Sequence, residues 1–371
     1  MNKKVCHLTS VHPIEDIRIF HKECVSLAKN GFDVTLIACG DTSYETVKNG
    51  VNLISLKIPV KNRIERMIKR TRAIYKKALE IDADIYHIHD PELLIYANKL
   101  KTKGKKIIFD SHEDVPSDIF EKKYLPFILR LLLSRFYIIF ERHSLKKYDV
   151  VISVTPHIVE RLSKINNKTY QITNYPLYQD LKKKKEVDKY ETPTLLFAGG
   201  VSPLWMHENI LKAIENIDVR YIIAGKSSDN YLELLSEYKG WGKVTYLGKI
   251  PHEHVNELYQ KCHVGVALMD YATSAGGKLG TLGNTKLFEI MMSGLPILCT
   301  DFVLWKNIVE VNNIGLCVNP HDIDSITTAL KNLLFNVEEA KNMGRRGKQI
   351  ALNGYTWESQ EKLLVEIYQS L

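Results

Sequence analysis

Short apolar runs alternate with longer amphipathic stretches along both halves of the chain. In the first half the apolar runs lie at 5–9, 34–39, 53–56, 85–88, 107–110 and 150–154, with helical periodicity between most of them. The second half repeats the pattern at 195–198, 220–224, 244–247, 264–268, 297–300 and 316–318. Near-continuous apolar strands joined through helices are typical of parallel sheets covered on both faces. We therefore predict an α/β chain made of two Rossmann-like domains.

A polar segment between the halves is predicted to link them. Residues 179–193 contain few apolar positions and include four consecutive lysines at 182–185, which favours a solvated linker. We therefore place an N-terminal domain at 1–178, the linker at 179–193 and a C-terminal domain at 194–355. In such an arrangement the ligand site is expected in the cleft between the domains.

The stretch 284–293 is predicted to form a helix that ends at Gly294, a residue suited to the left-handed C-terminal position. Its apolar residues recur at the helical period, and Pro296 restarts the chain as an extended run. The helix follows the glycine-rich segment 276–283, so its free amides lie near Asn284 and Thr285. Close backbone approach and a helix N-terminus are features that bind a diphosphate.

Charged residues around this helix fit the same ligand. Lys278 and Lys286 supply positive charge on either side of the helix start. Glu289 lies about one turn further on, where a carboxylate can accept hydrogen bonds from both hydroxyls of a ribose. A nucleotide sugar is the ligand class that combines these groups.

The order and spacing of several motifs resemble the retaining group 1 glycosyltransferases, family GT4, over the whole chain. The resemblance rests on the segments 89–92, 109–113, 195–200, 222–225, 244–248, 286–296 and 355–357. It implies a GT-B fold, with two parallel sheets facing each other across a cleft and a final helix, within 356–371, that crosses back to the N-terminal domain. It also implies a metal-independent enzyme with no cofactor.

By this resemblance the chain would transfer a hexose or N-acetylhexosamine from a nucleotide diphosphate sugar, with UDP as the first expectation. The acceptor would be a glycan or lipid-linked glycan in bacterial surface polysaccharide biosynthesis. Two alternatives stay open: a nucleotide-sugar hydrolase or epimerase of the same fold, and a non-catalytic partner subunit that has lost activity.

The resemblance also assigns candidate catalytic residues. His112 occupies the family position that faces the donor sugar and the acceptor, next to Glu113, and both follow a predicted parallel strand. A strand-end histidine bonded to a backbone carbonyl is the alternative for His112. His89 and Asp90 end the preceding strand and would either shape the acceptor pocket or cap the following helix. Asp16 and Arg18 are similar to the acceptor-side loop of the subgroup, and an ordinary surface ion pair is the alternative.

Two positions depart from the family pattern. Thr281 stands where many members have a second glutamate, and the turn at Gly199 and Gly200 is not followed by the usual arginine and lysine. Other cations must then neutralise the diphosphate. Lys226, Lys278 and Lys286 are the candidates, with exposed surface lysine as the alternative for each.

Composition agrees with a soluble enzyme of two domains. The 371 residues are 45% hydrophobic and 25% charged, and the six cysteines form no CxxC pair. Reduced thiols fit a cytoplasmic protein. The first apolar run is interrupted at His12 and Pro13, so we expect no signal peptide.

The net positive charge of the chain lies in the N-terminal half. Residues 1–180 carry a net charge of +9, the remainder −1, and much of the excess lies in a basic stretch at 61–77. No nucleic-acid-binding signature accompanies it, so the expected partner is an anionic membrane surface on the inner face of the plasma membrane. A second segment, 125–147, mixes Arg130, Arg135 and Arg142 with apolar residues. It would be a core helix with arginines at its edge or a helix lying in the membrane plane.

Overall fold

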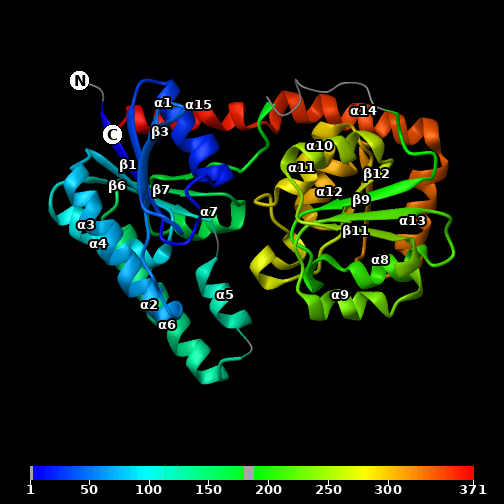
Figure 1. Ribbon diagram of the computed structural model, residues 1–371, viewed down its shortest axis with the longest axis horizontal. Coiled ribbons are helices and arrows are strands. Elements are labelled where there is room, and N and C mark those ends of the chain that lie inside the picture. Colours follow the sequence, from blue (N-terminus) through cyan, green and yellow to red (C-terminus); the bar gives the residue numbers. More distant parts are fainter. Residues whose placement is uncertain (1–2, 113, 123, 179–187) are drawn as a thin grey trace. The chain divides into compact units, whose positions relative to one another are not determined.

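The computed structural model describes residues 3–112, 114–122, 124–178 and 188–371, and the chain divides into two compact units (Figure 1). The first unit is Met1–Asn174 with Trp357–Leu371, and the second is Tyr175–Thr356. Glu113 and lysines 182–185 lie outside the described residues, while residues 188–193 of the expected linker belong to the second unit. The two α/β units confirm the predicted fold class.

The first unit is built on a sheet of eight strands in the order β3-β4-β2-β1-β5-β6-β7-β8. Neighbouring strands are parallel except for β3 and β4, which form an antiparallel pair at one edge. The central strands are almost wholly buried, which is why they read as continuous apolar runs. The strands are β1 Lys4–Leu8, β2 Asp33–Cys39, β3 Tyr44–Lys48, β4 Val51–Leu56, β5 Ile85–Ile88, β6 Lys106–Ser111, β7 Val150–Ser153 and β8 Thr169–Gln171.

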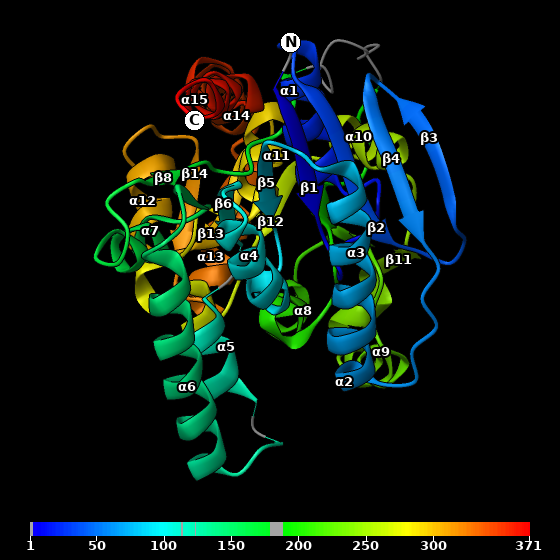
Figure 2. The ribbon, with the colours of Figure 1, turned by 90° about the vertical axis from the view of Figure 1, so that its left-hand side faces the viewer.

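Helices cover this sheet and lengthen the unit at one end. They are the π-helices η1 Ile17–Cys24 and η2 Arg66–Arg70, the 3₁₀ turn η3 Pro91–Leu93, and the α-helices α1 Val25–Lys29, α2 Arg63–Glu65, α3 Thr71–Ile81, α4 Leu94–Thr102, α5 Val115–Glu121, α6 Phe127–Leu145, α7 Pro156–Ser163 and α15 Trp357–Gln369. The stack of α2, η2 and α3 and the long helix α6 extend beyond the sheet in the same direction (Figure 2).

The last helix, α15, belongs to the first unit because its buried face packs there. Trp357 is buried and its indole Nε1 donates to Ser26 Oγ of α1 at 2.9 Å. Gln360 accepts a hydrogen bond from the backbone amide of Thr173 at 3.0 Å. Leu364 and Tyr368 are also fully buried, and each large apolar side chain removed from water contributes roughly 1.5 to 3 kcal/mol.

The second unit holds a parallel sheet of six strands in the order β11-β10-β9-β12-β13-β14. The strands are β9 Thr194–Ala198, β10 Arg220–Ala224, β11 Val244–Gly248, β12 Val264–Ala267, β13 Ile297–Thr300 and β14 Gly315–Val318. The α-helices are α8 His207–Ile214, α9 Asp229–Ser236, α10 His252–Lys261, α11 Thr285–Ser293, α12 Val303–Val309, α13 Ile323–Phe335 and α14 Val337–Gly354, and the 3₁₀ turns are η5 Pro203–Trp205, η6 Lys239–Lys243, η7 Thr273–Ala275 and η8 Gly277–Leu279.

Helix α11 begins and ends as its sequence indicates. The Asn284 side chain caps it by accepting from the Lys286 amide at 3.0 Å, and Gly294 closes it with φ 78°. Leu287, Phe288 and Met291 are buried on the face that packs into the core. The opposite face therefore carries the polar residues of the predicted donor site.

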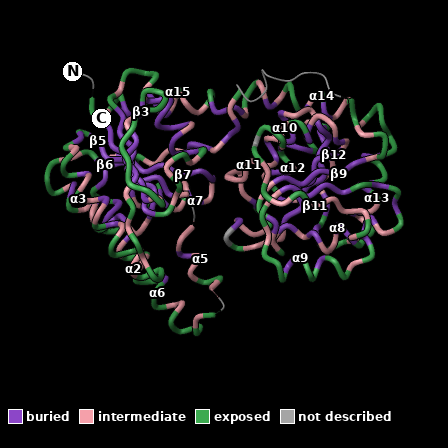
Figure 3. Tube along the Cα trace, in the orientation of Figure 1, coloured by how far each residue is buried: buried purple, intermediate pink, exposed green. Residues whose placement is uncertain are grey.

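The expectation that segment 125–147 is a core helix is wrong. Only Ser134, Glu141, Ser144 and Leu145 of α6 are buried. Phe136 and Ile139 are 72% and 70% exposed, and much of the helix is exposed or half-buried in Figure 3. The helix projects beyond the sheet, so most of its apolar side chains have no core to enter. Within the described residues no helix combines the length and hydropathy needed to cross a bilayer.

Candidate functional site

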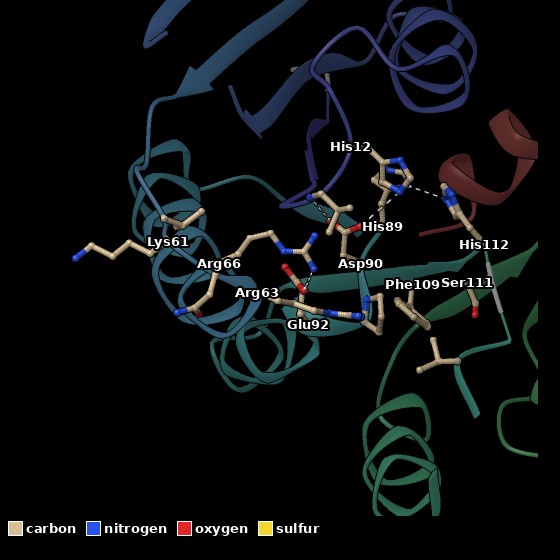
Figure 4. Close-up of a pocket in the computed structure, with 15 residues that line it drawn as sticks. His12, Lys61, Arg63, Arg66, His89, Asp90, Glu92, Phe109, Ser111 and His112 are labelled. Carbon is tan, nitrogen blue, oxygen red and sulfur yellow. Dashed lines mark hydrogen bonds and ion pairs between the residues drawn. The ribbon is translucent and has the colours of Figure 1, made fainter. Parts of the chain in front are cut away.

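A pocket of about 630 Å³ opens at the carboxyl-terminal edge of the first sheet. Its walls come from the segments that follow β1, β4 and β5 and from the end of β6, the edge at which ligands of parallel sheets bind. Figure 4 shows His12, His89 and His112 on one side of it and Lys61, Arg63 and Arg66 on the other. The predicted catalytic residues His89 and His112 thus lie on one wall, opposite a group of cations.

Asp90 holds the loop after β1 in place. Its Oδ2 accepts from Thr9 Oγ1 at 2.8 Å, from the Ser10 amide at 2.5 Å and from the Val11 amide at 3.3 Å. Its side chain makes no capping bond to η3, so the helix-cap alternative is not what the structure shows. Asp90 lines the pocket, with its Oδ1 3.6 Å from His12 Nε2.

The cations of the pocket come from one helix end. Asn62 caps α2 by accepting from the Glu65 amide at 2.9 Å, and this places Lys61 and Arg63 at the pocket wall. Arg66 Nη2 donates to Glu92 Oε2 at 3.1 Å, and Ser10 Oγ donates to the other oxygen of Glu92 at 2.6 Å. The wall thus carries three cations and two carboxylates, and the carboxylates of Asp90 and Glu92 already accept hydrogen bonds from the protein. The excess of positive charge makes this wall suited to an anionic ligand.

His112 is the reactive group that combines pocket access with a fixed orientation. Its side chain is 17% exposed, and its Nε2 lies 2.9 Å from Oδ2 of the fully buried Asp110. Its ring also lies 5.4 Å from that of His12 and 5.5 Å from that of His89, between centroids. The alternative for His112 was a hydrogen bond to a backbone carbonyl, but its partner in the structure is the carboxylate of Asp110. Glu113, the other candidate at this place, lies outside the described residues.

Arg18 was expected on the acceptor side or in a surface ion pair, but the structure shows it buried. Its guanidinium is 4% exposed, and its Nε and Nη2 both lie 2.9 Å from Asp110 Oδ2. Nη1 donates to the Ile172 carbonyl at 2.9 Å, and Nε lies 3.0 Å from Glu23 Oε1. Neither the acceptor role nor a surface ion pair is compatible with these contacts. Asp16 is the N-cap of η1, accepting from the amides of Arg18 and Ile19 at 2.8 and 3.0 Å.

The buried charges under the pocket balance one another. Burial alone would raise the pKa of Asp110, but Arg18 and His112 outweigh it and hold that pKa well below its usual range. Burial raises the pKa of Glu23 well above its usual range, against the attraction of Arg18. Arg18 therefore pairs with the ionised Asp110, while burial disfavours a second negative charge on Glu23.

Three neutral histidines surround this group. His7 on β1 pairs in register with His87 on β5, and His89 follows two residues later on the same face. Burial lowers the pKa of His87 to about 3, and it lowers the pKa values of His7 and His89 well below the usual value. His7 Nδ1 lies 2.9 Å from His89 Nε2, and Tyr368 Oη lies 2.6 Å from His87 Nδ1.

By distance alone, two groups of these residues could hold a metal ion. They are His7, Glu23, His87 and His89, and His89, Asp110 and His112, with ligand atoms within 4.8 Å of one another in each group. A metal needs the free lone pairs of its ligand nitrogens. Here His7 Nδ1 and His89 Nε2 share one hydrogen bond, and Tyr368 occupies His87 Nδ1. The residues therefore fit a hydrogen-bonded network better than a metal centre.

The second unit brings Gly199 and Lys286 together. Gly199 follows β9 with φ 140°, and a Cβ at this position would lie 2.2 Å from Lys286 Cε and 2.5 Å from its Nζ. A side chain at this position would have to displace the end of Lys286, and the positive φ also favours glycine. Gly225 is similarly required, because a Cβ there would lie 1.7 Å from the Gly199 carbonyl oxygen. Gly200 is exposed, with open space around its Cα.

Lys286 is a desolvated cation. Its Nζ lies 4.0 Å from the ring centroid of Trp205 and 5.3 Å from that of Phe197. Burial lowers its pKa to about 8, with Glu289 acting in the opposite direction. Among the described residues no carboxylate oxygen lies within ion-pair distance of this nitrogen. An ammonium group held in this way at the start of a helix is suited to an anionic ligand.

The other residues predicted to bind the nucleotide sugar are Thr285, Glu289, Lys226 and Lys278. Thr285 opens α11, and Glu289 lies half-buried one turn on, accepting a long hydrogen bond from Tyr259 Oη at 3.4 Å. Lys226 is exposed at the end of β10, where its carbonyl accepts from the Val201 amide at 2.9 Å. Lys278 is exposed too, with its Nζ 5.5 Å from the ring centroid of Tyr271.

Thr281, which stands where many family members have a glutamate, makes hydrogen bonds within its own loop and to Trp305. Its Oγ1 accepts from the Gly283 amide at 3.0 Å, and its carbonyl accepts from Trp305 Nε1 at 2.7 Å. Sequence reasoning missed Trp205, Tyr259 and Tyr368. No local pattern marks them, because each meets its partner through the tertiary fold.

Two family models of glycosyltransferases match the chain, one over each half. The family model described as glycosyl transferases group 1 matches residues 179–350, and the one described as glycosyltransferase family 4 matches residues 19–174. A D-inositol 3-phosphate glycosyltransferase of Nocardia farcinica is 26% identical over 192 residues, which is 48% of this chain and 40% of that protein. The chain thus matches less than half the length of this curated relative.

Solved structures share the fold over nearly the whole chain. Sucrose-phosphate synthase of Thermosynechococcus elongatus has a TM-score of 0.76 at 16% identity, covering 100% of this chain and 99% of its own. WaaG, a glycosyltransferase involved in lipopolysaccharide biosynthesis, has a TM-score of 0.73 at 15% identity, covering 98% and 99%. HepE of Anabaena, solved with UDP and glucose, has a TM-score of 0.72 at 10% identity, covering 100% of both.

Proposed function

Because the chain belongs to the group 1, family-4-like glycosyltransferases, we propose that it transfers a sugar from a nucleotide diphosphate donor with retention of anomeric configuration. The observation that carries this proposal is the desolvated Lys286 ammonium, held against Gly199 at the start of α11. A diphosphate supplies the negative charge that this nitrogen lacks.

Further groups support a nucleotide at this place. The first amides of α11 and the turn at Gly199 and Gly200 can donate to phosphate oxygens. Glu289 lies on the same helix, one turn beyond Lys286, where it can accept from the ribose hydroxyls. HepE binds UDP and UDP-glucose, and this supports UDP as the nucleotide in our proposal. The transferred sugar would be a hexose or N-acetylhexosamine.

The chemistry we propose needs no metal and no nucleophile. Transfer requires stabilisation of a departing nucleoside diphosphate and of an oxocarbenium-like sugar. Lys286 and the α11 amides would neutralise the leaving group, and His112 would hydrogen bond to a sugar hydroxyl from the first unit. We further propose that the pocket near Lys61 and Arg63 receives the acceptor, a glycan linked to an anionic lipid, in bacterial surface polysaccharide biosynthesis.

One observation favours a second candidate function. Thr281 and the missing arginine and lysine after Gly200 are departures that a non-catalytic partner subunit could tolerate. A hydrolase or epimerase would instead keep the donor site and lose the acceptor. A single screen separates them: UDP-, GDP- and ADP-sugars are incubated with and without a lipid-linked acceptor mixture, and both released nucleotide and epimerised nucleotide sugar are measured.

The nucleotide identified by this screen allows a binding test of Glu289. We expect Glu289→Ala to weaken donor binding by about 1.5 to 3 kcal/mol, roughly 10- to 150-fold in Kd, because charge-assisted hydrogen bonds to the ribose are lost. Isothermal titration with the active nucleotide measures this. Glu310→Ala, an exposed glutamate at the end of α12, is the matched control. Unchanged affinity in Glu289→Ala, or no turnover of any donor by the wild type, contradicts the proposal.

We also propose that the first unit docks on the cytoplasmic face of an anionic membrane. The α2 and η2 segment carries Ile64, 70% exposed, and Ile68 beside the exposed cations Arg63 and Lys69. The projecting part of α6 carries exposed apolar side chains together with Arg135. Both segments extend in the same direction, which supports one plane of contact (Figure 2).

Liposome sedimentation checks the docking. Each cation near an anionic surface contributes about 1 kcal/mol and is screened by salt, so binding should require anionic lipid and weaken at high salt. We expect Arg63→Glu with Lys69→Glu, and separately Phe136→Ser with Ile139→Ser, to reduce the bound fraction at least fivefold. Phe335→Ser, an exposed apolar change in the second unit, is the control. Sedimentation that ignores lipid charge, or dimerisation abolished by the α6 variant, contradicts membrane docking.

A further inference from the structure

Tyr368, on the last helix α15, contacts the histidines beneath the pocket of the first unit. It is fully buried on α15, and its ring stacks edge-on with Phe32 at 5.7 Å between centroids. Its hydroxyl lies between two imidazoles, 2.6 Å from His87 Nδ1 and 3.2 Å from His7 Nε2. A phenol in this position can donate to one ring and accept from the other.

A continuous path of polar contacts connects this hydroxyl with the pocket. His7 Nδ1 lies 2.9 Å from His89 Nε2, and His89 Nδ1 lies 3.4 Å from His112 Nε2. The same nitrogen of His112 lies 2.9 Å from Asp110 Oδ2. Two imidazoles, His7 and His89, therefore lie between Tyr368 on the last helix and His112.

Asp110 fixes the direction of every bond on this path. Arg18 keeps Asp110 ionised, and an ionised carboxylate only accepts, so His112 Nε2 must carry the proton. His89 Nδ1 faces this N–H and must accept, which leaves the proton of the neutral His89 ring on Nε2. His89 then donates to His7 Nδ1, and His7 Nε2 donates to Tyr368 Oη. Tyr368 in turn donates to His87 Nδ1.

We propose that Tyr368 is a positioning residue for His112: through His7 its hydroxyl holds His89 in the tautomer whose Nδ1 accepts from the Nε2–H of His112, and this keeps His112 oriented with Nδ1 as the acceptor for a ligand hydroxyl. Without the hydroxyl, His7 has no partner for an Nε2 proton and can carry it on Nδ1 instead. His89 must then move its own proton to Nδ1, where it meets the N–H of His112. The tautomer part of the proposal stands on its own, while its effect on turnover rests on the proposed function.

Histidine ¹⁵N NMR of the full-length protein tests the tautomers directly. In the wild type at pH 7.5 we expect His7, His87 and His89 to be single Nε2–H tautomers, with signals assigned by single histidine-to-glutamine variants. In Tyr368→Phe we expect His7 and His89 to shift toward Nδ1–H or to average between tautomers. A wild-type His89 protonated at Nδ1 overturns the proposal, even if the Phe variant fails to fold.

Turnover gives the second readout. We expect Tyr368→Phe to lower kcat about 5- to 20-fold while donor Kd changes less than twofold. Tyr148→Phe is the matched control, because Tyr148 is a buried tyrosine of the same unit whose hydroxyl donates to the Leu94 carbonyl at 3.1 Å, away from the histidines.

Three results overturn the proposal. One is unchanged His89 tautomer and kcat in Tyr368→Phe, and another is an equal loss of kcat in Tyr148→Phe. The third is stoichiometric zinc in the purified protein whose removal shifts the His7 and His89 nitrogens, because a metal would then occupy the lone pairs that the network uses. If no donor is turned over, the NMR result still decides the tautomer assignment, so the two failures are distinguishable.

Discussion

Replacing His112 with alanine is expected to lower kcat about 100-fold or more while changing the Kd of the nucleotide less than twofold. His112 lines the pocket of the first unit, whereas Gly199, Lys286 and Glu289 belong to the second. Loss of one positioned hydrogen-bonding group at a reacting centre costs about 10²- to 10³-fold. Single-turnover kinetics and calorimetry separate the two quantities.

The control for His112→Ala is His254→Ala, an exposed histidine on α10. His112→Gln separates the two ring nitrogens, because glutamine can donate in place of Nε2–H but offers no equivalent of Nδ1. Equal losses of kcat and nucleotide affinity in His112→Ala would mean that the residue supports the fold of the site and does not contact the sugar.

Acidification from pH 6.5 to 5.5 is expected to destabilise the first unit, with a slope that steepens as the pH falls. His7, His87 and His89 have pKa values lowered by burial, whereas histidines of the unfolded chain titrate near 6.5, so the unfolded state binds up to three more protons below that pH. Glu23, whose folded pKa is raised by burial, opposes this by up to one proton between its unfolded and folded pKa values. The net difference approaches two protons, or about 3 kcal/mol per pH unit, only well below pH 6.5, where the unfolded histidines are largely protonated, and it is smaller above that pH. Asp110 adds to the loss only at lower pH, because its folded pKa is depressed.

Urea unfolding at pH 7.5, 6.5 and 5.5 measures this slope. Replacing Trp205, Trp241 and Trp305 with phenylalanine leaves Trp357, buried in the first unit, as the only tryptophan, which can be excited selectively at 295 nm. In His87→Gln the slope should fall by about one proton, whereas His143→Gln, an exposed histidine on α6, should leave it unchanged. A free energy of unfolding that does not depend on pH between 7.5 and 5.5 would show that the histidines are already protonated in the folded state.

The sheet cores could be predicted from sequence because burial on both faces leaves an apolar signature. Strands such as β5 and β13 are buried at every position, so each appears as an uninterrupted run. Helix α11 was predictable for a different reason: its cap, its glycine stop and its periodic face are all local. The pairing of Gly199 with Lys286 needed the fold, since the two residues are distant in sequence.

What could not be predicted depends on tertiary surroundings. The apolar composition of α6 is the same whether a core or solvent covers it, and only the structure shows that it projects. Arg18 has the composition of a surface charge but lies beside two buried carboxyl groups. His7, His89 and Tyr368 come from separate segments, so no spacing in the sequence brings them together.

Strands β3 and β8 escaped prediction because they lack buried faces: all five residues of β3 are exposed, and the three of β8 are half-buried. These two strands form the edges of the first sheet. On β3, Glu45 pairs with Lys77 at 2.9 Å and Lys48 pairs with Glu15 at 2.7 Å. An open strand edge would otherwise template addition of a strand from another molecule and lead to aggregation. One edge of the sheet is a charged strand and the other is only three residues long. Another chain therefore finds little apolar surface and few free backbone groups to pair with, which protects this large sheet from aggregation in the crowded cell.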